Sequence, residues 1–460
     1  MVAVPILQGV YVDTDGDFNF SYPVNREPII TELGFSKGYL RPAPGVIQMG
    51  TGPGADRGGK VWNGTLYRVM GDKLVSVASD GAVTPIGSVT GSETVQMDFS
   101  FDRLAVNAGM KLYYLHNGSF YQVTDPDLGP VIDMLWIDGY FMTTDGEFLV
   151  VTELLDPDQV DPLKYGSSEE SPDPITGLMK LHGEVYALNR TTIEVFQNIG
   201  GNGFPFQRNS GALIEKGCVG PRAKAYIAQT FAFVGGGQNE SVGVYFAGAG
   251  AALKVSTTVV DDILSQFTEE ELYDIVVEAR IDSDEQRLLI HLPTQTLCYY
   301  VNASKTLGHP VWVFLASGIQ FDEPYLPRNA VRAFGKWVVG DKNGRLGYYD
   351  YGVSTQFGDV AGYRFDTVLL YNDSAWAILG DVELIGTPGR NSNIFFSCTT
   401  DGQTWGLETQ IYGGSTGRRD TRMVTRPRRR FSNWMGLRFR GSDEGTSSFA
   451  RLEADIEALA

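Results

Sequence analysis

Short runs that alternate apolar and polar residues follow one another along most of this chain. Residues 61–69 have Asn-Gly between two such runs, and residues 114–121 repeat the arrangement. Asn-Gly in this setting is a strong signal for a β-hairpin, because both residues tolerate the positive φ angles of a tight turn. The pattern therefore predicts antiparallel strands joined by short turns.

The strand-like runs come in groups, which predicts repeated sheets. Around residues 104–115, one run ends in a turn, a second run follows, and another turn leads to a third. At roughly 45 residues per group, residues 51–355 would form six or seven blades of a β-propeller. The repeat carries no WD or kelch signature, and an array of β-sandwiches is the alternative for the same pattern.

One segment has clear helical features, residues 261–277. Thr268 and Glu271 have the spacing of a capping box, in which each side chain bonds the backbone N–H of the other residue. An apolar stripe that includes Leu272 and Val276 follows. We expect a helix inserted between two blades.

The character of the sequence changes at residues 351–362, which are small and turn-forming. Residues 362–460 contain further strand-like runs and predict an antiparallel β-sandwich. Residues 1–50 are expected to complete the propeller or to lead into it. The predicted fold class is all-β, with a propeller over residues 51–355 and a C-terminal sandwich.

The composition fits two folded β domains and limits the kinds of partner. The chain has 460 residues, of which 43% are hydrophobic, and its 55 glycines fit many tight turns. A formal net charge of −18 makes most of the surface repulsive to nucleic acids and anionic membranes. No apolar run reaches the roughly 20 residues of a membrane-spanning helix. The N-terminal segment lacks the basic start and apolar stretch of a secretory signal.

The three cysteines are far apart in the sequence, at Cys218, Cys298 and Cys398. This number and spacing fit neither a disulfide framework nor a zinc site. We expect small buried core residues in a protein made in a reducing cytosol.

No set of residues predicts catalysis or a bound cofactor. Residues 54–60 resemble a phosphate-binding loop, but Val61 stands where a Ser or Thr would hold magnesium, and a hairpin follows. Residues 13–17 begin like a calcium loop, but Phe18 replaces the glycine that the loop requires. The histidines form no metal-binding or nucleophile motif: His116, His182, His291 and His309.

Two further segments have structural interpretations. Residues 156–175 are acidic and rich in proline, and we expect a solvated loop that its prolines stiffen, with weak binding of a divalent ion as the alternative. Residues 401–405 read Asp-Gly-Gln-Thr-Trp and resemble the Asp-box turn of sialidase propellers, which is a structural turn. No carboxylate pair with glycosidase spacing accompanies it.

A basic segment, residues 418–440, departs from the acidic composition. One interpretation is phosphate contact by arginine with stacking by the interleaved aromatic residues. The other, which the net charge of −18 favours, is that the arginines pair with carboxylates of a neighbouring subunit or partner. A solvated strand face is the third. The candidate interface residues are Arg418, Arg422, Arg426, Arg428, Arg429 and Arg430.

Several segments together carry a family resemblance. They include PILQGV at 5–10, GYLRPAPGV at 38–46, DPLKYGSSEESPDPI at 161–175, TTIEVF at 191–196 and FTEEEL at 267–272. No one of them is specific, but in this order they cover nearly the whole chain. The set resembles the packaged-DNA stabilisation family, the tail-hub proteins of short-tailed bacteriophages.

The resemblance implies a non-enzymatic virion protein, made in the host cytoplasm and located in the tail. It implies a homohexameric ring below the portal and its adaptor ring, which extends the DNA channel and retains packaged DNA. The implied further partners are a tail needle or tip and fibre or tailspike proteins, with DNA only as cargo. A carbohydrate-binding or glycan-cleaving propeller, or a surface scaffold propeller, is the alternative.

Overall fold

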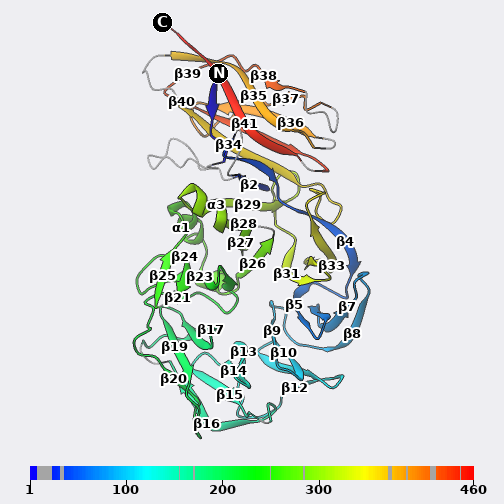
Figure 1. The fold of residues 1–460 in the computed structure, drawn as a ribbon, viewed down its shortest axis with the longest axis vertical. Coiled ribbons are helices and arrows are strands. Elements are labelled where there is room, and N and C mark those ends of the chain that lie inside the picture. The colour runs from blue at the N-terminus through cyan, green and yellow to red at the C-terminus, as the bar shows by residue number, and fades with distance from the viewer. Residues whose placement is uncertain are drawn as a thin grey trace.

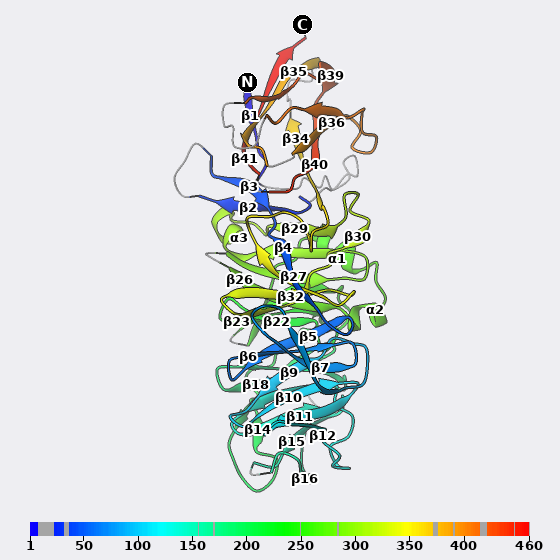
Figure 2. The ribbon, with the colours of Figure 1, turned by 90° about the vertical axis from the view of Figure 1, so that its right-hand side faces the viewer.

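The computed structural model describes two β domains stacked along the long axis of the molecule (Figures 1 and 2). The first is a ring of sheets, and the second is a sandwich that contains both chain termini (Figure 1). The described residues are 1–7, 23–31, 36–154, 156–168, 171–248, 250–282, 285–370, 376–389, 392–414, 421–445 and 447–459.

The ring is a propeller of seven antiparallel sheets in the described residues. Blades 1 to 3 are β5(Asp56–Trp62) to β8(Val83–Ser88), β9(Gln96–Phe99) to β12(Ser119–Gln122), and β13(Asp133–Ile137) to β16(Val160–Ser167). Blades 4 and 5 are β17(Ile175–Leu181) to β20(Phe206–Arg208), and β21(Gly217–Cys218) with β22(Lys224–Ile227) to β25(Ala251–Lys254). Blade 6 is β26(Val276–Asp282) to β30(Glu323–Pro324), with β27(Glu285–His291), β28(Thr296–Tyr300) and β29(Trp312–Ser317) between them.

Blade 7 closes the ring with a strand from the start of the chain. It contains β31(Arg328–Ala333), β32(Lys336–Gly340) and β33(Arg345–Asp350), and its outer strand is β4(Gly45–Thr51). Tyr348 of β33 lies opposite Ile47 of β4. The propeller is therefore held shut by main-chain hydrogen bonds between two distant parts of the sequence.

The predicted fold class is confirmed, and the blade number is the larger of the two expected. The Asn-Gly hairpins form as predicted: Asn63 and Gly64 have φ angles of 48° and 78°, and Asn117 and Gly118 have 48° and 77°. The first pair joins β5 to β6(Thr65–Met70), and the second joins β11(Lys111–His116) to β12.

The helical insertion differs from its prediction. Two short helices, α1(Thr258–Leu264) and α2(Glu269–Tyr273), stand between β25 and β26. The capping box of Thr268 and Glu271 is present, but it begins a new helix after α1 has ended. The prediction of one helix over residues 261–277 is wrong in extent, because Val276 and Val277 pair with β27 as a strand. A third helix, α3(Val301–Leu307), follows β28 and had no sequence signal.

The acidic segment at residues 156–175 is not a loop throughout. Its middle part is β16, the outer strand of blade 3, which pairs with β15(Phe148–Thr152). Pro162 is tolerated there because an edge strand needs no donor on its open side. The expectation of a solvated loop is wrong for this part, and Glu169 and Glu170 lie outside the described residues.

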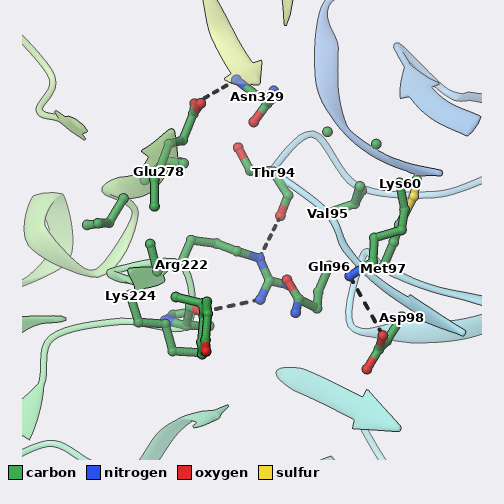
Figure 3. A pocket seen from close by; sticks show the side chains of 18 of the residues that line it. Lys60, Thr94, Val95, Gln96, Met97, Asp98, Arg222, Lys224, Glu278 and Asn329 are labelled. Carbon is green, nitrogen blue, oxygen red and sulfur yellow. Dashed lines mark hydrogen bonds and ion pairs between the residues drawn. The ribbon is translucent and has the colours of Figure 1, made fainter. Parts of the chain in front are cut away.

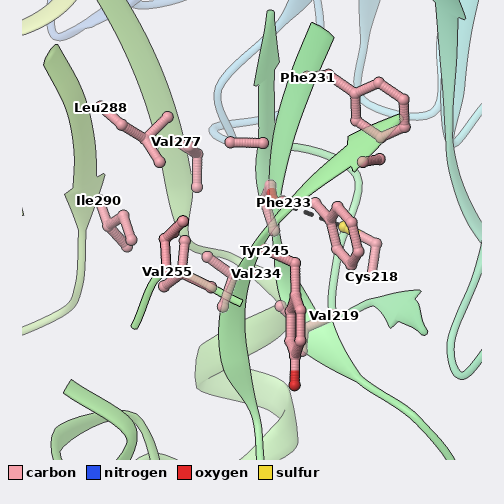
Figure 4. Close-up of a cluster of buried hydrophobic side chains, with 14 of the residues drawn as sticks. Cys218, Val219, Phe231, Phe233, Val234, Tyr245, Val255, Val277, Leu288 and Ile290 are labelled. Carbon is pink, nitrogen blue, oxygen red and sulfur yellow. Dashed lines mark hydrogen bonds between the residues drawn. The ribbon is translucent and has the colours of Figure 1, made fainter. Parts of the chain in front are cut away.

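The apolar core runs from blade to blade. Figure 4 shows its largest cluster, in which Phe233 and Val234 of blade 5 pack with Val277 and Leu288 of blade 6. Cys218 is buried in this cluster, as the sequence predicts. Burial of such side chains gives roughly 25 cal/mol per Å² of apolar surface, which is the main stabilisation of adjacent blades.

The sandwich consists of two packed sheets. The first contains β2(Arg26–Ile30), β3(Gly38–Pro42), β41(Ser448–Ala458), β35(Trp376–Thr387) and β38(Met423–Thr425), with β1(Val2–Val4) beside β41 and β39(Arg429–Ser432) beside β35. The second contains β34(Gly362–Leu370), β40(Trp434–Ser442), β36(Asn393–Thr399) and β37(Thr409–Ile411). The N-terminal segment thus serves both domains: β4 belongs to the propeller, whereas β1, β2 and β3 belong to the sandwich.

Candidate functional site

The N-terminal segment also forms the joint between the two domains. Residues 23–25 lie between β29 of the propeller and β34 of the sandwich. The N–H of Val24 donates to the carbonyl of Arg364 at 2.7 Å, and the N–H of Asn25 donates to the carbonyl of Phe314 at 2.9 Å. Main-chain hydrogen bonding therefore continues from blade 6 into the sandwich.

Asn25 fixes the path of the chain at this joint. It is buried and has a φ of 55°, in the left-handed region that Asn tolerates better than most residues. Its side-chain nitrogen donates to the carbonyls of Ala316 and Gly362 at 2.9 and 2.8 Å. Its side-chain oxygen accepts the N–H of Ala316 at 3.0 Å. One side chain thus satisfies backbone groups of β29 and of β34.

The next residue, Arg26, makes a buried ion pair on the sandwich side. Its Nη2 lies 3.0 Å from Oδ2 of Asp443, and its guanidinium lies over the ring of Tyr363, with 3.6 Å between the Cζ atom and the ring centre. Asp443 also accepts the hydroxyls of Ser354 and Ser447 at 2.8 and 2.6 Å. These added bonds offset part of the desolvation cost of the two charges.

Glu27 makes the matching contact on the propeller side. Arg287 of β27 donates to its two carboxylate oxygens at 2.8 and 2.9 Å, Arg41 donates at 3.1 and 3.2 Å, and Arg280 lies 3.8 Å away. Burial alone would raise the pKa of Glu27, but the charge and hydrogen bonds of Arg287, with the charges of Arg41 and Arg280, lower that pKa to about 2. The carboxylate therefore stays ionised at neutral pH.

Three consecutive residues thus connect to three different places. Asn25 bonds to the backbone of β29 and β34, Arg26 bonds to Asp443, and Glu27 bonds to Arg287. Neighbouring side chains of a strand point to opposite faces, so β2 can hold the sandwich with one residue and the propeller with the next. No local pattern in the sequence predicts this joint, because all the partners except Arg41 are hundreds of positions away.

Inside the propeller, acidic side chains of inner strands tie successive blades together. Asp98 of β9 accepts the N–H of Trp136 at 2.9 Å, and Asp133 of β13 accepts the N–H of Leu178 at 2.8 Å. Glu278 of β26 accepts two backbone N–H groups of β31 at 2.6 and 2.9 Å. These carboxylates satisfy buried N–H groups that face the axis and so stabilise the ring.

One arginine crosses the axis of the propeller. Arg222, which precedes β22, donates through Nε to the carbonyl of Thr94 at 3.1 Å (Figure 3) and through Nη1 to Asp133 at 2.7 Å. The channel around it has a volume of about 540 Å³. Arg222 lies across this space and leaves no open path for duplex DNA, which is wide enough to hold an α-helix in its major groove. The axis of one propeller therefore cannot be a path for duplex DNA.

The basic segment forms several ion pairs within its own chain. Arg418 lies outside the described residues, as does Arg419. The pairs are Arg422 with Glu383 at 2.6 Å, Arg426 with Asp381 at 3.1 Å, Arg438 with Asp366 at 2.7 Å, and Arg440 with Glu408. The sequence analysis expected carboxylates of a neighbouring subunit or partner, whereas Arg422 and Arg426 pair within their own chain.

Three consecutive arginines of this segment remain exposed. Arg428, Arg429 and Arg430 have no carboxylate partner among the described residues. The guanidinium of Arg430 lies over the ring of Trp376, with 4.1 Å between the Cζ atom and the ring centre, and Trp376 is 48% exposed. We call Arg428, Arg429, Arg430 and Trp376 the basic edge, because β39 is an edge strand of the first sandwich sheet.

Two other residues from the sequence analysis, one in the Asp-box-like turn and one histidine, make structural contacts. Asp401 accepts the N–H groups of Gln403 and Thr404 at 3.0 and 2.7 Å, and these bonds hold the pKa of Asp401 well below its ordinary value. His291 is buried, with its Nε2 atom 3.1 Å from Oε1 of Glu278. The loop at residues 13–17 lies outside the described residues.

Two kinds of feature are absent from the described residues. No group of three or more potential metal ligands comes together among them. Within the same residues no helix has the length and apolar character needed to cross a bilayer.

Two family descriptions match this chain, one for each domain. The description "Bacteriophage P22 Gp10, beta-propeller" matches residues 2–354, and "Bacteriophage P22 Gp10, beta-sandwich" matches residues 362–457. The chain belongs to the bacteriophage P22 Gp10 family. The resemblance that the sequence segments carried is confirmed, and with it the prediction of a structural component of the virion tail.

A curated member of the Gp10 family matches nearly end to end. The tail hub protein gp10 of Salmonella phage P22 is 27% identical over 461 residues, which cover 95% of each chain. It is a structural tail protein in a family of non-enzymatic virion proteins.

Solved structures show a more distant likeness. The Pan2 WD40 domain of Neurospora crassa has a TM-score of 0.42 and 9% identity, and covers 66% of this chain and 94% of its own. The N-terminal domain of Nup159 has a TM-score of 0.40 and 10% identity over 71% of this chain and 98% of its own. PorZ of Porphyromonas gingivalis has a TM-score of 0.40 and 10% identity, over 80% of this chain and 46% of its own.

Proposed function

We propose that this chain is the hub of a short phage tail, in which six copies form a ring that extends the DNA channel. The observation that carries the proposal is the end-to-end match, through both domains, to the tail hub protein of phage P22. A ring also fits the geometry of one copy: since Arg222 crosses the propeller axis, DNA would have to pass between copies and not through one.

The joint between the domains suits a part that bears load. Packaged DNA presses on the tail, and a hub that retains it must keep its two domains in a fixed relation. The main-chain bond from Asn25 to Phe314 and the buried pair of Glu27 with Arg287 oppose any rotation of the sandwich against the propeller. A buried pair that loses its partner costs about 3–5 kcal/mol, so the joint would open only under strong force.

The basic edge is the proposed contact with the next copy or with the adaptor ring. Arg428, Arg429 and Arg430 are exposed, whereas the chain as a whole carries −18, so most surfaces that they could meet are acidic. Arginine forms bidentate bonds with carboxylates, and the exposed ring of Trp376 would add apolar area to the contact. Arg422 and Arg426 flank the basic edge. Each already pairs with a carboxylate of its own chain, so we expect them to contribute less to the contact.

The proposed role is mechanical, and we propose no reaction for it. The ring would sit below the portal and adaptor, support a needle or tip and the fibres or tailspikes, and let DNA move past an acidic wall to which it does not stick. Opening at infection would then be a change in how the copies pack.

The test is the mass of the complex that the chain forms with a portal–adaptor assembly, measured by light scattering. The chain is measured alone and then in the mixture, because the docking platform can be what brings the copies together. The expected result is six added copies per assembly. A chain that stays monomeric in the mixture contradicts the hub proposal.

A charge reversal tests the basic edge. The triple variant R428E/R429E/R430E should join the assembly at least tenfold more weakly, with an unchanged unfolding midpoint. The matched control is K305E/K336E/K342E, which changes the net charge equally through exposed propeller lysines and should assemble normally. If the two variants assemble equally well, the basic edge is not the contact. The proposal of a six-copy ring is then tested by the mass measurement alone.

A further inference from the structure

We propose that the central channel of the propeller is a binding site for an acidic, partly apolar peptide segment of another protein. This goes beyond the hub function, which uses the outside of the molecule. The channel has a volume of about 540 Å³, and the inner strands of all seven blades line it. A large concave site with a few convergent charged groups is the default place for a ligand.

The channel is open at one end and nearly closed at the other. The inner strands run in the same direction, so the residues that end them gather at one face of the propeller. There Lys60 and Lys180 are 41% and 43% exposed. At the other end Arg222 and Lys224 are only 13% and 5% exposed. A ligand would therefore enter past the two lysines and end near Arg222.

Both ends of the channel carry more positive than negative charge. At the open end Lys60 and Lys180 share Asp98, at 3.7 and 2.6 Å. At the closed end Arg222 and Lys224 share Asp133, at 2.7 and 2.6 Å. Two cations on one carboxylate leave a surplus of one positive charge at each end. Glu278, the third acid of the channel, lies beside His291 and accepts two backbone N–H groups, and when its charge is counted the channel keeps a surplus of one positive charge.

This surplus is unusual in a chain of net charge −18 and favours an anionic ligand. The carboxylates already present are committed to cations or to backbone N–H groups. Two donors remain: no hydrogen bond of Arg222 Nη2 or of the Gln96 amide is found among the described residues, and both groups face the channel in Figure 3. Both can donate hydrogen bonds to a carboxylate of the ligand at the closed end.

The walls between the two charged ends are apolar. They include Met97, Met179, Val277 and Val331. Methionine adapts its shape to different partners, which suits a site for a side chain such as Leu or Ile. Around the open end, Phe101 is 92% exposed and stands edge-on to Trp136, with 6.0 Å between the ring centres. The site is thus apolar in its middle and at its rim, and cationic at both ends.

These features fit an extended peptide better than a nucleic acid. The charged groups at the two ends stand about three residues apart along β9, from Val95 to Asp98, which is about 10 Å of strand. Three or four extended residues with alternating acidic and apolar side chains span that length. A DNA strand would place its phosphates and sugars against the apolar walls, where they would lose water without gaining hydrogen-bond partners.

The test uses fluorescence anisotropy with the full chain and a labelled hexapeptide of alternating leucine and aspartate. The expected result is saturable binding that weakens as salt rises. The same peptide with lysine in place of aspartate should bind at least tenfold more weakly. No saturable binding up to about 1 mM, or equal binding of the lysine peptide, overturns the proposal. Tighter binding of a short thymidine oligonucleotide overturns it in favour of nucleic acid.

Two variants test whether the peptide binds in the channel. K60Q/K180Q removes the charge at the open end and should weaken peptide binding at least tenfold, whereas the control K305Q/K342Q, on the outer surface, should not. M179W fills the channel without changing charge and should abolish binding, with circular dichroism to verify folding. Unchanged binding by either K60Q/K180Q or a folded M179W moves the peptide elsewhere and overturns the assignment.

Discussion

Glu27 and Arg287, which are 260 positions apart in the sequence, form a buried bidentate ion pair between the sandwich and the propeller, with N–O distances of 2.8 and 2.9 Å. Both side chains are almost completely buried, with exposures of 1% and 0%. Such a pair can form only after both domains have folded and docked. It therefore reports on the joint itself and not on either domain alone.

Replacing Glu27 by glutamine should destabilise the joint strongly. The variant keeps the shape of the side chain but leaves Arg287, Arg280 and Arg41 without their carboxylate, and breaking a buried pair costs about 3–5 kcal/mol. The control is Glu323→Gln, at a site that is 52% exposed and 3.7 Å from Lys342, where the change should stay within about 0.5 kcal/mol. Urea unfolding followed by tryptophan fluorescence measures both, and equal midpoints would contradict a role for Glu27 in holding the domains.

Acidification should remove part of the stability between pH 4.5 and pH 2. Burial alone would raise the pKa of Glu278, but His291 and the backbone N–H groups of Ala330 and Asn329 lower it from 4.5 to about 2, as the arginines do for Glu27. A lowered folded-state pKa gives stability that is complete above pH 4.5 and is lost as the pH falls towards 2. Each shift is worth about 3 kcal/mol.

The measurement is the urea midpoint at several pH values from 6 to 3. Wild type should lose stability steeply below pH 4.5. Glu278→Gln should be less stable at pH 6 and should depend less on pH below 4.5, because it lacks one of the two groups. Parallel pH profiles for the two proteins would show that Glu278 does not titrate with folding.

Local features of the fold could be predicted from the sequence, and long-range pairings could not. The hairpin turns at Asn63 and Asn117 and the capping box at Thr268 rest on neighbouring residues, and all three are present. In contrast, Val2 of β1 pairs with Ala454 of β41, and no local pattern connects them. The strand β16 was missed because its proline and acidic residues are typical of loops, although an outer strand tolerates them.

The candidate site shows the same limit. The arginines of residues 421–440 are conspicuous in the sequence, but whether each one meets a carboxylate of its own chain depends on strand order. Arg422 meets Glu383 because β38 lies beside β35 in the sheet. Arg430 lies beside Ile378 in β35 and stacks on Trp376 instead of meeting an acid. The channel groups Asp133, Arg222 and Lys224 gave no signal at all, because they come together only when the ring closes.

Ring closure by β4 should decide whether the propeller folds alone. We expect residues 45–355 to form a monomeric, cooperatively unfolding propeller, and residues 56–355 to aggregate. The two fragments differ in β4 and the four residues after it, and the shorter one leaves the edge of β33 open to other chains. Size-exclusion chromatography with light scattering compares them. A monomeric, stable fragment of residues 56–355 would show that main-chain closure is dispensable.

A double-mutant cycle on Asp133 and Lys224 tests how the channel holds its charge. Asp133 is fully buried and forms ion pairs with Lys224 at 2.6 Å and Arg222 at 2.7 Å. Asp133→Asn leaves two cations without a carboxylate and should cost about 3–5 kcal/mol. Lys224→Met should cost less, because Asp133 keeps Arg222 and the N–H of Leu178. The double variant should then be more stable than Asp133→Asn alone, because the buried ammonium is gone. The free energies of urea unfolding give the coupling, and simple addition of the two single effects would mean that the two charges do not depend on each other.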